Sequence, residues 1–504
     1  MEAALAKADG TQGHGAAETA GRARGIIHFT STTATNIVHA ELAAMLAAQR
    51  RAFAHRQPDT SQRIRALRDL LKAVRGRREE FVQAIAQDFG GRSRQETLLL
   101  EVFPVVDTIR HAIRHLPEWV RPRPVPAGWQ FLPGRARVTY QPLGVVGIIG
   151  AWNYPLLLSV SPMLSALAAG NHVMLKPSEL APRTAGLLAR LAADLFDDEY
   201  VTVVTGGAET GAAFASQPFD HLLFTGSTRV GKLIMRSASE NLTPVTLELG
   251  GKSPALVQRD FPLTTAAARI MAGKLYNAGQ TCIAPDYVLV HADAREEFTR
   301  RAAEAAQAMY PRLVSNPDYT RIINQDHYQR LRGLVADAAI KGAEVLELNP
   351  AHETANADNR VFPPTLLWNV SDPMAVMREE IFGPILPVVA YQSLDEAIEY
   401  VNSRPRPLAL YYFDNNSKRV DSVLARTVSG GVTVNDTILH IAQNDLPFGG
   451  VGASGMGFYH GFDGFETFSK KKGIFLQSRF TTLGMLRPPY STLARRVTDW
   501  LIGR

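Results

Sequence analysis

One stretch of the sequence alternates between short apolar runs and helical patterns, and this alternation restricts the folds open to the chain. Short β-branched or apolar runs, which predict buried strands, lie at 145–149, 173–175, 201–204 and 221–224. Between them the apolar spacing of a helix covers 158–169 and 184–195. Parallel strands need crossover connections, which are usually helices. We therefore expect an α/β fold with a doubly wound parallel sheet.

A second alternation of the same kind follows between residues 255 and 434. It has helical patterns at 264–275, 295–309 and 327–339, and strand-like runs near 287–290 and 386–390. The part before the first alternation predicts two or three amphipathic helices over 37–116, a proline-rich connector over 117–133 and an edge strand or hairpin arm at 136–140. With 504 residues, 46% of them hydrophobic, the chain is long enough for two or three domains.

Composition and charge exclude several classes of protein. A single cysteine cannot form a disulfide framework or a thiolate metal site, so we expect no metal and a reducing, cytoplasmic location. The net charge of +6 comes largely from scattered arginines, and the local excess at 110–137 is interrupted by prolines, so we expect no nucleic-acid partner. No run of 18 apolar residues occurs, so no integral membrane segment is expected. Weak surface association through the amphipathic residues 491–504 stays open.

The only cysteine, Cys282, is the first candidate for chemistry. A thiolate is the strongest nucleophile that a protein side chain offers, and Gly279 and Thr281 place this one in a tight backbone setting. The alternative is a cysteine that serves as a small buried apolar residue.

Polar residues that follow the predicted strands are the next candidates, because a doubly wound sheet binds ligands at the carboxyl ends of its strands. Asn153 follows the first strand and offers a neutral amide donor, although it also suits a turn or a cap. Lys176 and Glu179 follow the second strand, where a glutamate suits the free 2′-hydroxyl of a dinucleotide ribose. A surface ion pair is the alternative for these two.

Further candidates lie at two glycines, at a glutamate in an apolar run and before a late strand. Gly226 and Gly231 bracket a predicted helix start, a setting that binds anions, although the spacing is not the dinucleotide fingerprint. Burial should raise the pKa of Glu248 towards that of a general base, unless it pairs with the backbone or with Lys252. The third set, Glu380 and Phe382, suits either a ligand contact or a capped turn with a core phenylalanine.

Taken together, these motifs resemble the aldehyde dehydrogenase superfamily over about residues 37–472. The resemblance rests on seven segments in the family's order: 151–155 (AWNYP), 176–179 (KPSE), 224–228 (FTGST), 247–251 (LELGG), 279–282 (GQTC), 379–384 (EEIFGP) and 447–450 (PFGG). Within the superfamily, residues 280–286, 435–436 and 455–461 are similar to the class 3 branch, and to bacterial coniferyl aldehyde dehydrogenases in particular.

The resemblance implies an aldehyde dehydrogenase-like fold, with two doubly wound parallel-sheet domains and a small β oligomerisation element. The implied parts are a flexible tail (1–36), an NAD(P)-binding domain (37–247, with the arm 135–142 in the oligomerisation element), a catalytic domain (248–437), a return segment that completes that element (438–475) and a C-terminal extension (476–504). A subunit-bridging sheet, and with it a homodimer, is expected.

The resemblance also implies NAD(P)-dependent oxidation of an aldehyde to the acid. Cys282 would form the thiohemiacetal and thioester, Asn153 would bind the oxyanion, and Glu248 would activate water. The residues implied for the cofactor are Lys176, Glu179, Gly226, Ser227, Val230, Gly231, Leu249, Glu380 and Phe382, with NAD favoured and NADP as the alternative. The residues expected to line the pocket are Trp152, Tyr154, Ile438 and His440, which suit a phenylpropenal or a medium-chain or long-chain aliphatic aldehyde.

Three other functions remain open at this point. A CoA-acylating enzyme of the same family generally lacks the glutamate that matches Glu248. A cysteine hydrolase needs a histidine base, for which His440 and His460 are the candidates. The third is a catalytically idle binding protein on the same fold.

Overall fold

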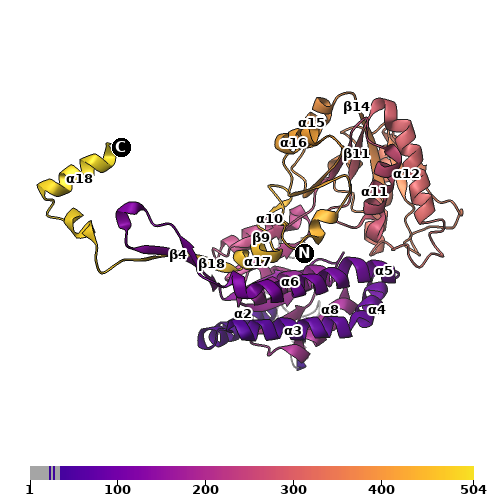
Figure 1. The fold of residues 1–504 in the computed structure, drawn as a ribbon. Coiled ribbons are helices and arrows are strands. Elements are labelled where there is room, and N and C mark those ends of the chain that lie inside the picture. The colour runs from indigo at the N-terminus through magenta and orange to yellow at the C-terminus, as the bar shows by residue number, and fades with distance from the viewer. Residues whose placement is uncertain (1–21, 24–25, 29–34, 504) are drawn as a thin grey trace.

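The computed structural model describes residues 22–23, 26–28 and 35–503, which form two large α/β lobes and a projecting arm (Figure 1). The first lobe contains the N-terminal helices and the first sheet, and the second lobe lies beside it. The expected fold class, two doubly wound sheets and a small third sheet, is confirmed.

The first sheet has a parallel centre and antiparallel edges. Its order is β1 (Arg22–Ala23), β2 (Ile26–His28), β7 (Val201–Thr205), β6 (His172–Lys176), β5 (Val145–Ile149), β8 (His221–Thr225), β9 (Val245–Glu248) and β17 (Gly455–Met456). Its crossover helices are α7 (Leu157–Ala169), α8 (Pro182–Leu195), α9 (Ala208–Ala215) and α10 (Thr228–Ser239). Every residue of β5, β6 and β8 is buried, as parallel strands covered on both faces require.

The direction of winding reverses between β5 and β8. The chain runs outward through β6 and β7, then returns to the other side of β5 for β8 and β9. Such a switch point opens a crevice at the carboxyl ends of the two central strands. The segments that leave these ends are 150–153 and 226–231, which hold several of the predicted site residues.

The second sheet is also parallel except at one edge. Its order is β12 (Glu344–Glu347), β13 (Thr365–Trp368), β14 (Ile385–Tyr391), β11 (Tyr287–His291), β10 (Pro254–Val257), β15 (Ala409–Phe413) and β16 (Gly431–Val434), with β12 antiparallel. Its longer helices are α11 (Leu263–Leu275), α12 (Arg295–Met309), α13 (Gln325–Ile340), α15 (Leu394–Asn402) and α16 (Ser417–Arg426). The sequence analysis predicts only β11 and β14 of these strands. It misses β15, which is as long as β11, so strand length alone does not separate the predicted strands from the missed ones.

The N-terminal region forms more helices than predicted. They are α2 (Thr35–His55), α3 (Thr60–Gly76), α4 (Arg78–Phe89), α5 (Arg94–Thr97) and α6 (Phe103–Trp119), with a π turn at Leu98–Val102 between the last two. Apolar spacing continues across the breaks, so periodicity alone does not reveal them. Gly90, in the left-handed conformation with φ 67°, ends α4.

Part of the predicted flexible tail is ordered, which corrects that prediction. Residues 26–28 pair parallel with β7, and residues 22–23 pair with β2. Without them β7 would present unpaired backbone groups at the sheet edge, and the β-branched pair Ile26–Ile27 suits such a position. Residues 35–36 of the predicted tail begin α2, and its other residues lie outside the described part of the chain.

The arm is a three-stranded sheet of β3 (Arg123–Val125), β4 (Arg135–Pro142) and β18 (Ser469–Leu476). β4 was predicted as an edge strand or hairpin arm, but it is the central strand, because β18 pairs with it along eight residues from Ser469↔Pro142 to Leu476↔Arg135. The last helix, α18 (Thr492–Ile502), lies beyond the arm, away from both lobes (Figure 1).

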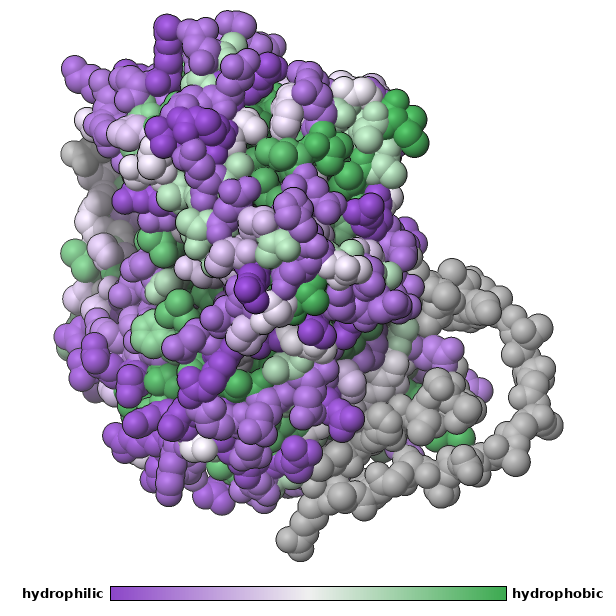
Figure 2. All heavy atoms as spheres, turned by 90° about the vertical axis from the view of Figure 1, so that its right-hand side faces the viewer, coloured by the Kyte–Doolittle hydropathy of each residue, from purple (hydrophilic) through white to green (hydrophobic). Residues whose placement is uncertain are grey.

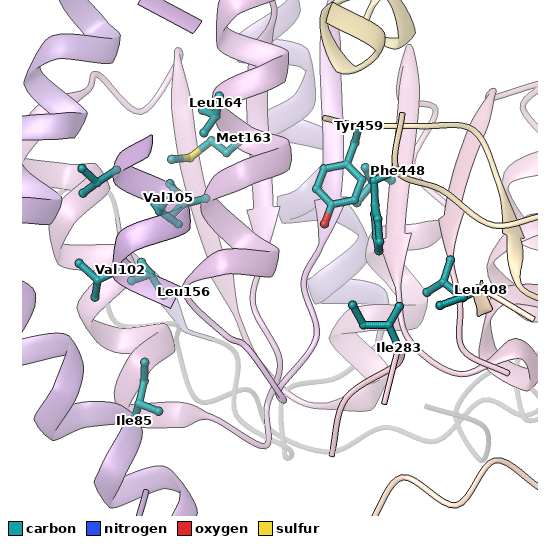
Figure 3. Packing of buried hydrophobic residues seen from close by; sticks show 14 of the residues in the cluster. Ile85, Val102, Val105, Leu156, Met163, Leu164, Ile283, Leu408, Phe448 and Tyr459 are labelled. Carbon is teal, nitrogen blue, oxygen red and sulfur yellow. The ribbon is translucent and has the colours of Figure 1, made fainter. Parts of the chain in front are cut away.

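A single apolar cluster crosses from the first lobe to the second. Val105 and Leu156 of the first lobe belong to the same buried cluster as Ile283 and Leu408 of the second (Figure 3). On the face shown in Figure 2 hydrophilic side chains dominate and apolar ones form separate patches. No helix in the described residues is long and apolar enough to cross a membrane.

Asn171 joins three parts of the first lobe. Its Oδ1 accepts hydrogen bonds from the backbone N–H groups of Leu143 (2.7 Å) and Gly144 (3.0 Å), and its Nδ2 donates to the carbonyls of Ala166 (3.1 Å) and Phe468 (2.8 Å). The side chain is fully buried. It therefore connects the approach to β5, the end of α7 and the residue that precedes β18.

Replacing Asn171 with leucine should strongly destabilise the protein. The change removes four buried hydrogen bonds at nearly constant volume, so we expect the free energy of unfolding to fall by about 3 kcal/mol, measured by urea denaturation. The control is Asn241→Leu, which removes one hydrogen bond at an exposed position (to Ser216 O, 2.9 Å) and should change stability by less than about 0.5 kcal/mol. Equal stabilities of the two variants would contradict the role given to Asn171.

Candidate active site

A strained turn presents Cys282 at the entrance to the second sheet. After α11, the turn Tyr276–Gly279 contains three successive residues in the left-handed conformation, Asn277 (φ 54°), Ala278 (φ 51°) and Gly279 (φ 73°). A Cβ on Gly279 would lie 2.2 Å from the carbonyl oxygen of Gly383, so only glycine fits there. Cys282 then precedes β11, half-buried and with a free thiol.

Asn153 of the first lobe is bonded directly to the segment before Cys282. Its Nδ2 donates to the carbonyl oxygen of Gln280 (3.1 Å), and its own carbonyl oxygen accepts from Nδ2 of Asn277 (3.0 Å). The next residue, Tyr154, has its hydroxyl 2.7 Å from the hydroxyl oxygen of Thr281. The structure thus joins the carboxyl end of β5 to the approach to β11.

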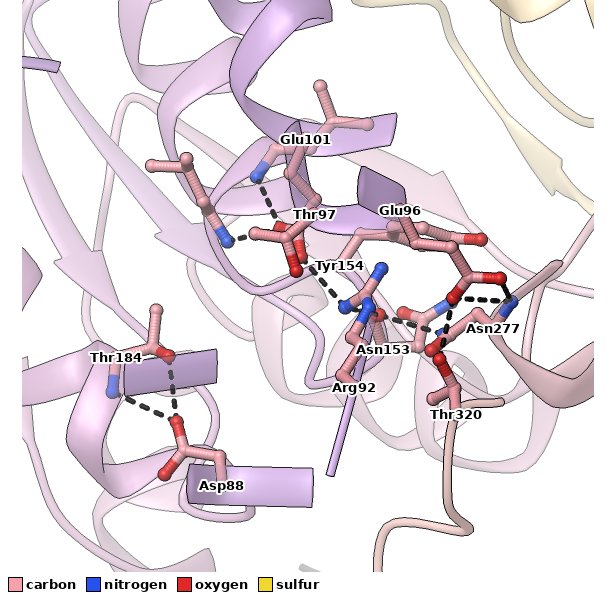
Figure 4. Close-up of polar contacts among 12 residues, drawn as sticks. Asp88, Arg92, Glu96, Thr97, Glu101, Asn153, Tyr154, Thr184, Asn277 and Thr320 are labelled. Atoms are coloured by element: carbon pink, nitrogen blue, oxygen red, sulfur yellow. Dashed lines mark hydrogen bonds and ion pairs between the residues drawn. The ribbon is translucent and has the colours of Figure 1, made fainter. Parts of the chain in front are cut away.

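A buried polar network beneath these residues was not predicted (Figure 4). Arg92 donates to Glu101 Oε1 (2.8 Å) and to the carbonyl oxygen of Asn153 (3.1 Å), and Glu101 Oε2 accepts from the backbone N–H of Leu156 (2.8 Å). Burial raises the pKa of Glu101, and Arg92 lowers it. Arg92 and Glu101 have fully buried side chains, so this pair is retained to fix the Asn153 turn rather than to gain stability.

A second carboxylate holds the turn before Cys282. Glu96 accepts hydrogen bonds from the backbone N–H of Asn277 (3.1 Å) and from the hydroxyl of Thr320 (2.6 Å). The only sequence signal for these groups is a charged residue within a helical apolar pattern. That signal does not reveal a partner almost two hundred residues away.

Glu248 is a buried carboxyl group with no partner. It is the last residue of β9 and only 3% exposed, and neither side-chain oxygen has a hydrogen-bond partner among the described residues. The alternative partner Lys252 is engaged elsewhere, since its Nζ donates to Asp286 and to the carbonyl oxygens of Val376 (2.8 Å) and Glu379 (3.0 Å). Burial raises the pKa of Glu248 well above its ordinary value.

Glu380 approaches the same region from the second lobe. Its carboxyl oxygens lie where a Cβ on Gly250 would be 2.2 Å away, so the glycine makes room for this side chain. Burial, together with the charge of Asp286, raises the pKa of Glu380 to about 8. Phe382, in the left-handed conformation (φ 50°), has its ring 5.4 Å from that of Trp152, so Trp152 lies next to a predicted cofactor residue.

The charges in this region act on one another. Burial raises the pKa of the Cys282 thiol to about 12, and the carboxylates of Glu380 and Glu248 contribute in the same direction. Three acidic groups therefore all favour their neutral forms. A positively charged ring placed among them would lower all three pKa values, so the site suits a ligand with a cationic part.

Lys176 and Glu179 form an ion pair at the end of β6. Lys176 is only 1% exposed and its Nζ donates to Glu179 Oε2 (2.7 Å), while the side chain of Glu179 is 37% exposed. Burial opposes the ionisation of Glu179, but the charge and hydrogen bond of Lys176 contribute to a pKa below the ordinary value. Glu179 therefore carries a negative charge at the surface beside β6.

The start of α10 is organised by its neighbours in the first lobe. Ser227 caps the helix by accepting from the backbone N–H of Val230 (3.3 Å), and Gly226 donates its N–H to the carbonyl oxygen of Glu248 (3.0 Å). A Cβ on Gly231 would lie 2.6 Å from a methyl group of Leu249. Gly226 therefore bonds to the end of β9, and Gly231 allows close packing on Leu249, the residue after β9.

The two histidines considered as hydrolase bases are packed in the interior. His440 Nδ1 lies 2.9 Å from the hydroxyl of Thr433, and the rings of His440 and His460 both stack on Phe448. Burial lowers the pKa of each histidine to about 4. In the described part of the chain neither histidine forms a hydrogen bond or ion pair with Cys282. Ile438, another predicted pocket residue, adopts a left-handed backbone (φ 53°) two residues before His440.

Comparison with known proteins gives one consistent answer. The model of the "Aldehyde dehydrogenase family" matches residues 21–474. A curated protein named "Probable coniferyl aldehyde dehydrogenase", from Pseudomonas aeruginosa, is 52% identical over 465 residues, which cover 92% of this chain and 97% of that protein.

Solved structures agree with the sequence comparison. One described as the substrate-bound state of Staphylococcus aureus AldH superposes with a TM-score of 0.86 at 37% identity, covering 91% of this chain and 99% of that one. The NAD+ complex of an aldehyde dehydrogenase from Bacillus cereus gives a TM-score of 0.79 at 29% identity, covering 88% and 89%.

Replacing Glu248 with glutamine should reduce the loss of stability that the wild type shows as the pH rises. The folded state holds the Glu248 proton above the ordinary pKa of 4.5, so between 4.5 and the raised value it binds more protons than the unfolded state. The free energy of unfolding of the wild type should fall through this window by about 1.4 kcal/mol per pH unit from this group, and Glu248→Gln should lack that loss. Urea denaturation at a series of pH values tests this; identical pH profiles would show that Glu248 is not held protonated.

Proposed function

The chain belongs to the aldehyde dehydrogenase family, and on that premise we propose that Cys282, Asn153 and Glu248 carry out the NAD(P)-dependent oxidation of an aldehyde to its carboxylic acid. The observation that carries this assignment is the partnerless, buried carboxyl of Glu248 in the same electrostatic environment as the only thiol of the chain. A buried polar group without a partner is destabilising and is retained where function requires it.

Cys282 attacks the aldehyde carbon after losing its proton. The surrounding groups raise the pKa of the thiol, so a base is needed, and the two nearby carboxylates are the candidates. The oxygen of the aldehyde then becomes negative. One N–H of the Asn153 amide is used by Gln280, which leaves the second N–H to stabilise the oxyanion.

A nicotinamide dinucleotide bound here would supply the hydride acceptor for oxidation of the thiohemiacetal, and Cys282 would then hold the product as a thioester. Three features of the chain fit such a group: the acidic surroundings that favour a cationic ring, the unpaired Oε1 of Glu380, and the crevice at the β5–β8 switch point. We assign Glu380 and Phe382 to the nicotinamide ribose, and Lys176 with Glu179 to the adenosine ribose. Gly226, Ser227, Val230, Gly231 and Leu249 are assigned to the pyrophosphate side.

Glu248 is the base of the last step. A bound cationic ring favours the ionised form of Glu248, and the ionised carboxylate then takes a proton from the water that hydrolyses the thioester. A CoA-acylating enzyme has no need for such a base, so the presence of Glu248 favours release of the free acid.

We propose NAD as the preferred cofactor and a phenylpropenal such as coniferaldehyde as the substrate class. The negative charge of Glu179 disfavours a 2′-phosphate, which supports NAD over NADP. The name of the Pseudomonas aeruginosa relative supports the substrate class. The aromatic residues Trp152 and Tyr154 next to the site also suit a planar substrate, with aliphatic aldehydes as the alternative.

Formation of reduced cofactor tests this proposal directly. We expect the purified protein to reduce NAD without CoA, with a higher kcat/KM for coniferaldehyde than for benzaldehyde, hexanal or decanal, and a lower kcat/KM when NADP replaces NAD. Cys282→Ala should lower kcat by at least about a thousandfold, because no other thiol exists in the chain.

Each part of this proposal has its own contrary result. A higher kcat/KM for decanal would replace the aromatic substrate class by an aliphatic one, and a preference for NADP would remove the role given to Glu179. Cofactor binding with no turnover of any aldehyde would favour an idle binding protein on this fold. A thiol titration that gives one thiol in the wild type and none in Cys282→Ala serves as the control.

We propose that the arm and the strands of the return segment bridge two copies of the chain. We also propose that the cofactor-binding domain covers residues 37–247 and the catalytic domain residues 248–437. Exposed apolar side chains gather on the arm and its tip, namely Trp129, Phe131, Leu132, Phe475 and Leu476. Exposed apolar groups beside an open strand edge favour association. Soluble monomers seldom leave such a surface uncovered.

The wild type should therefore have twice the mass of the chain in sedimentation equilibrium. The double variant Phe475→Asp, Leu476→Asp places two charges on the arm and should shift the equilibrium to the monomer. A monomeric wild type at micromolar concentration would contradict the proposal.

A further inference from the structure

Tyr459 carries a buried hydroxyl group that has no role in the mechanism described so far. It follows β17 in the segment 455–461, and its side chain is only 1% exposed. Within the part of the chain that the structure describes, the hydroxyl oxygen has no hydrogen-bond partner. Buried hydroxyl groups are nearly always bonded, so an unbonded one requires an explanation.

The position of Tyr459 is fixed on all sides. β17 pairs antiparallel with β9 and places Gly455 opposite Glu248, while the carbonyl oxygen of Tyr459 accepts a hydrogen bond from the hydroxyl of Ser165 (3.0 Å). The tyrosine ring packs edge-on against Phe448, with centroids 6.0 Å apart, and against His460, at 4.5 Å. The hydroxyl therefore points in one direction that the packing determines.

Tyr459 also lies on the side of the apolar cluster that borders the proposed catalytic residues. Figure 3 shows Tyr459 beside Phe448, on the same side of the cluster as Ile283, the neighbour of Cys282. Burial raises the pKa of the Tyr459 hydroxyl, and the charges of Glu248 and Cys282 raise it further, so both groups lie within electrostatic range of it. Tyr459 and Glu248 are thus two buried groups that have no hydrogen-bond partner among the described residues and that lie in the electrostatic environment of the same thiol.

We propose that Tyr459 is a positioning residue for hydrolysis of the thioester, and that its hydroxyl and the Glu248 carboxylate together hydrogen-bond the attacking water. This inference rests on the proposed function. One O–H of the water is held by Glu248 and the other by the hydroxyl oxygen of Tyr459, which leaves a lone pair of the water to face the acyl carbon.

The step is balanced without any further reactant. The water oxygen bonds to the acyl carbon, one water proton passes to Glu248, and the carbon–sulfur bond breaks with its electron pair on Cys282. The carboxylic acid leaves with the second water proton. Tyr459 keeps its own proton throughout, in agreement with its raised pKa.

Ester hydrolysis isolates this step, because p-nitrophenyl acetate acylates a thiol without any cofactor. We expect Tyr459→Phe to release the first equivalent of nitrophenolate at the wild-type rate and to turn over about tenfold more slowly afterwards, as the loss of one hydrogen bond to the water predicts. With coniferaldehyde and NAD, kcat/KM should stay unchanged, because it ends at hydride transfer. Hydroxylamine, which attacks the thioester without a positioned water, should restore turnover in Tyr459→Phe but not in Cys282→Ala.

The matched control is Tyr391→Phe, which also removes a buried tyrosine hydroxyl. Tyr391 lies at the carboxyl end of β14, whereas Cys282 precedes the amino end of the neighbouring parallel strand β11, and the Tyr391 hydroxyl donates to the carbonyl oxygen of Val257 (2.8 Å). Its deacylation rate should equal that of the wild type. Tyr459→Phe should be at least as stable as the wild type, because the hydroxyl that it removes has no partner.

Two results would overturn the inference. A wild-type deacylation rate in Tyr459→Phe would leave the hydroxyl without a role, and a slower first release of nitrophenolate would assign it to acylation instead. A Tyr459→Phe protein that does not fold would show that the hydroxyl is structural, which also contradicts the proposal. A wild type that reacts with neither ester nor aldehyde would instead refute the proposed function itself.

Discussion

The hydrogen bonds between Asn153 and the turn before Cys282 are the interaction on which the rest of the site depends. They join the carboxyl end of β5 to the entrance of the second sheet, so the two lobes meet where the thiol is presented. The amide of Asn277 bridges the carbonyl oxygens of Asn153 and Gln280, which requires the left-handed backbone of the turn. Strain in this turn is held by buried groups, above all Glu96, that satisfy its backbone.

The electrostatics of the site follow from the same meeting of lobes. Glu248 comes from the first sheet and Glu380 from the second, and each is buried close to Cys282. Burying three acids together lowers the stability of the protein, because each acid is pushed towards its neutral form. The same arrangement favours binding of a cationic ligand and provides a carboxylate that can accept a proton. The active site is therefore less stable than an apolar core would be, and the proposed chemistry requires this.

Much of this could be predicted from the sequence because the relevant signals are local. The strands β5, β6, β7 and β8 and the helices between them have clear periods, and Asn153, Lys176 and Gly226 were predicted at their carboxyl ends. The same reasoning missed most strands of the second sheet, including β15, which is as long as the recognised strands β5 to β8. It also gave too few N-terminal helices, because apolar spacing continues across the capped breaks.

The sequence by itself determined the alternation of strands and helices, the single thiol and the order of motifs, which together fix the fold class and the family. Only the tertiary structure decided which buried groups face one another. It placed Arg92, Glu96 and Glu101 beneath the active-site turn, showed that Lys252 is occupied elsewhere and buried the hydroxyl of Tyr459 where the charges of Glu248 and Cys282 act on it. These pairs are far apart along the chain, and a hydrogen bond or a raised pKa depends on distance and burial in space, which no local pattern of residues contains.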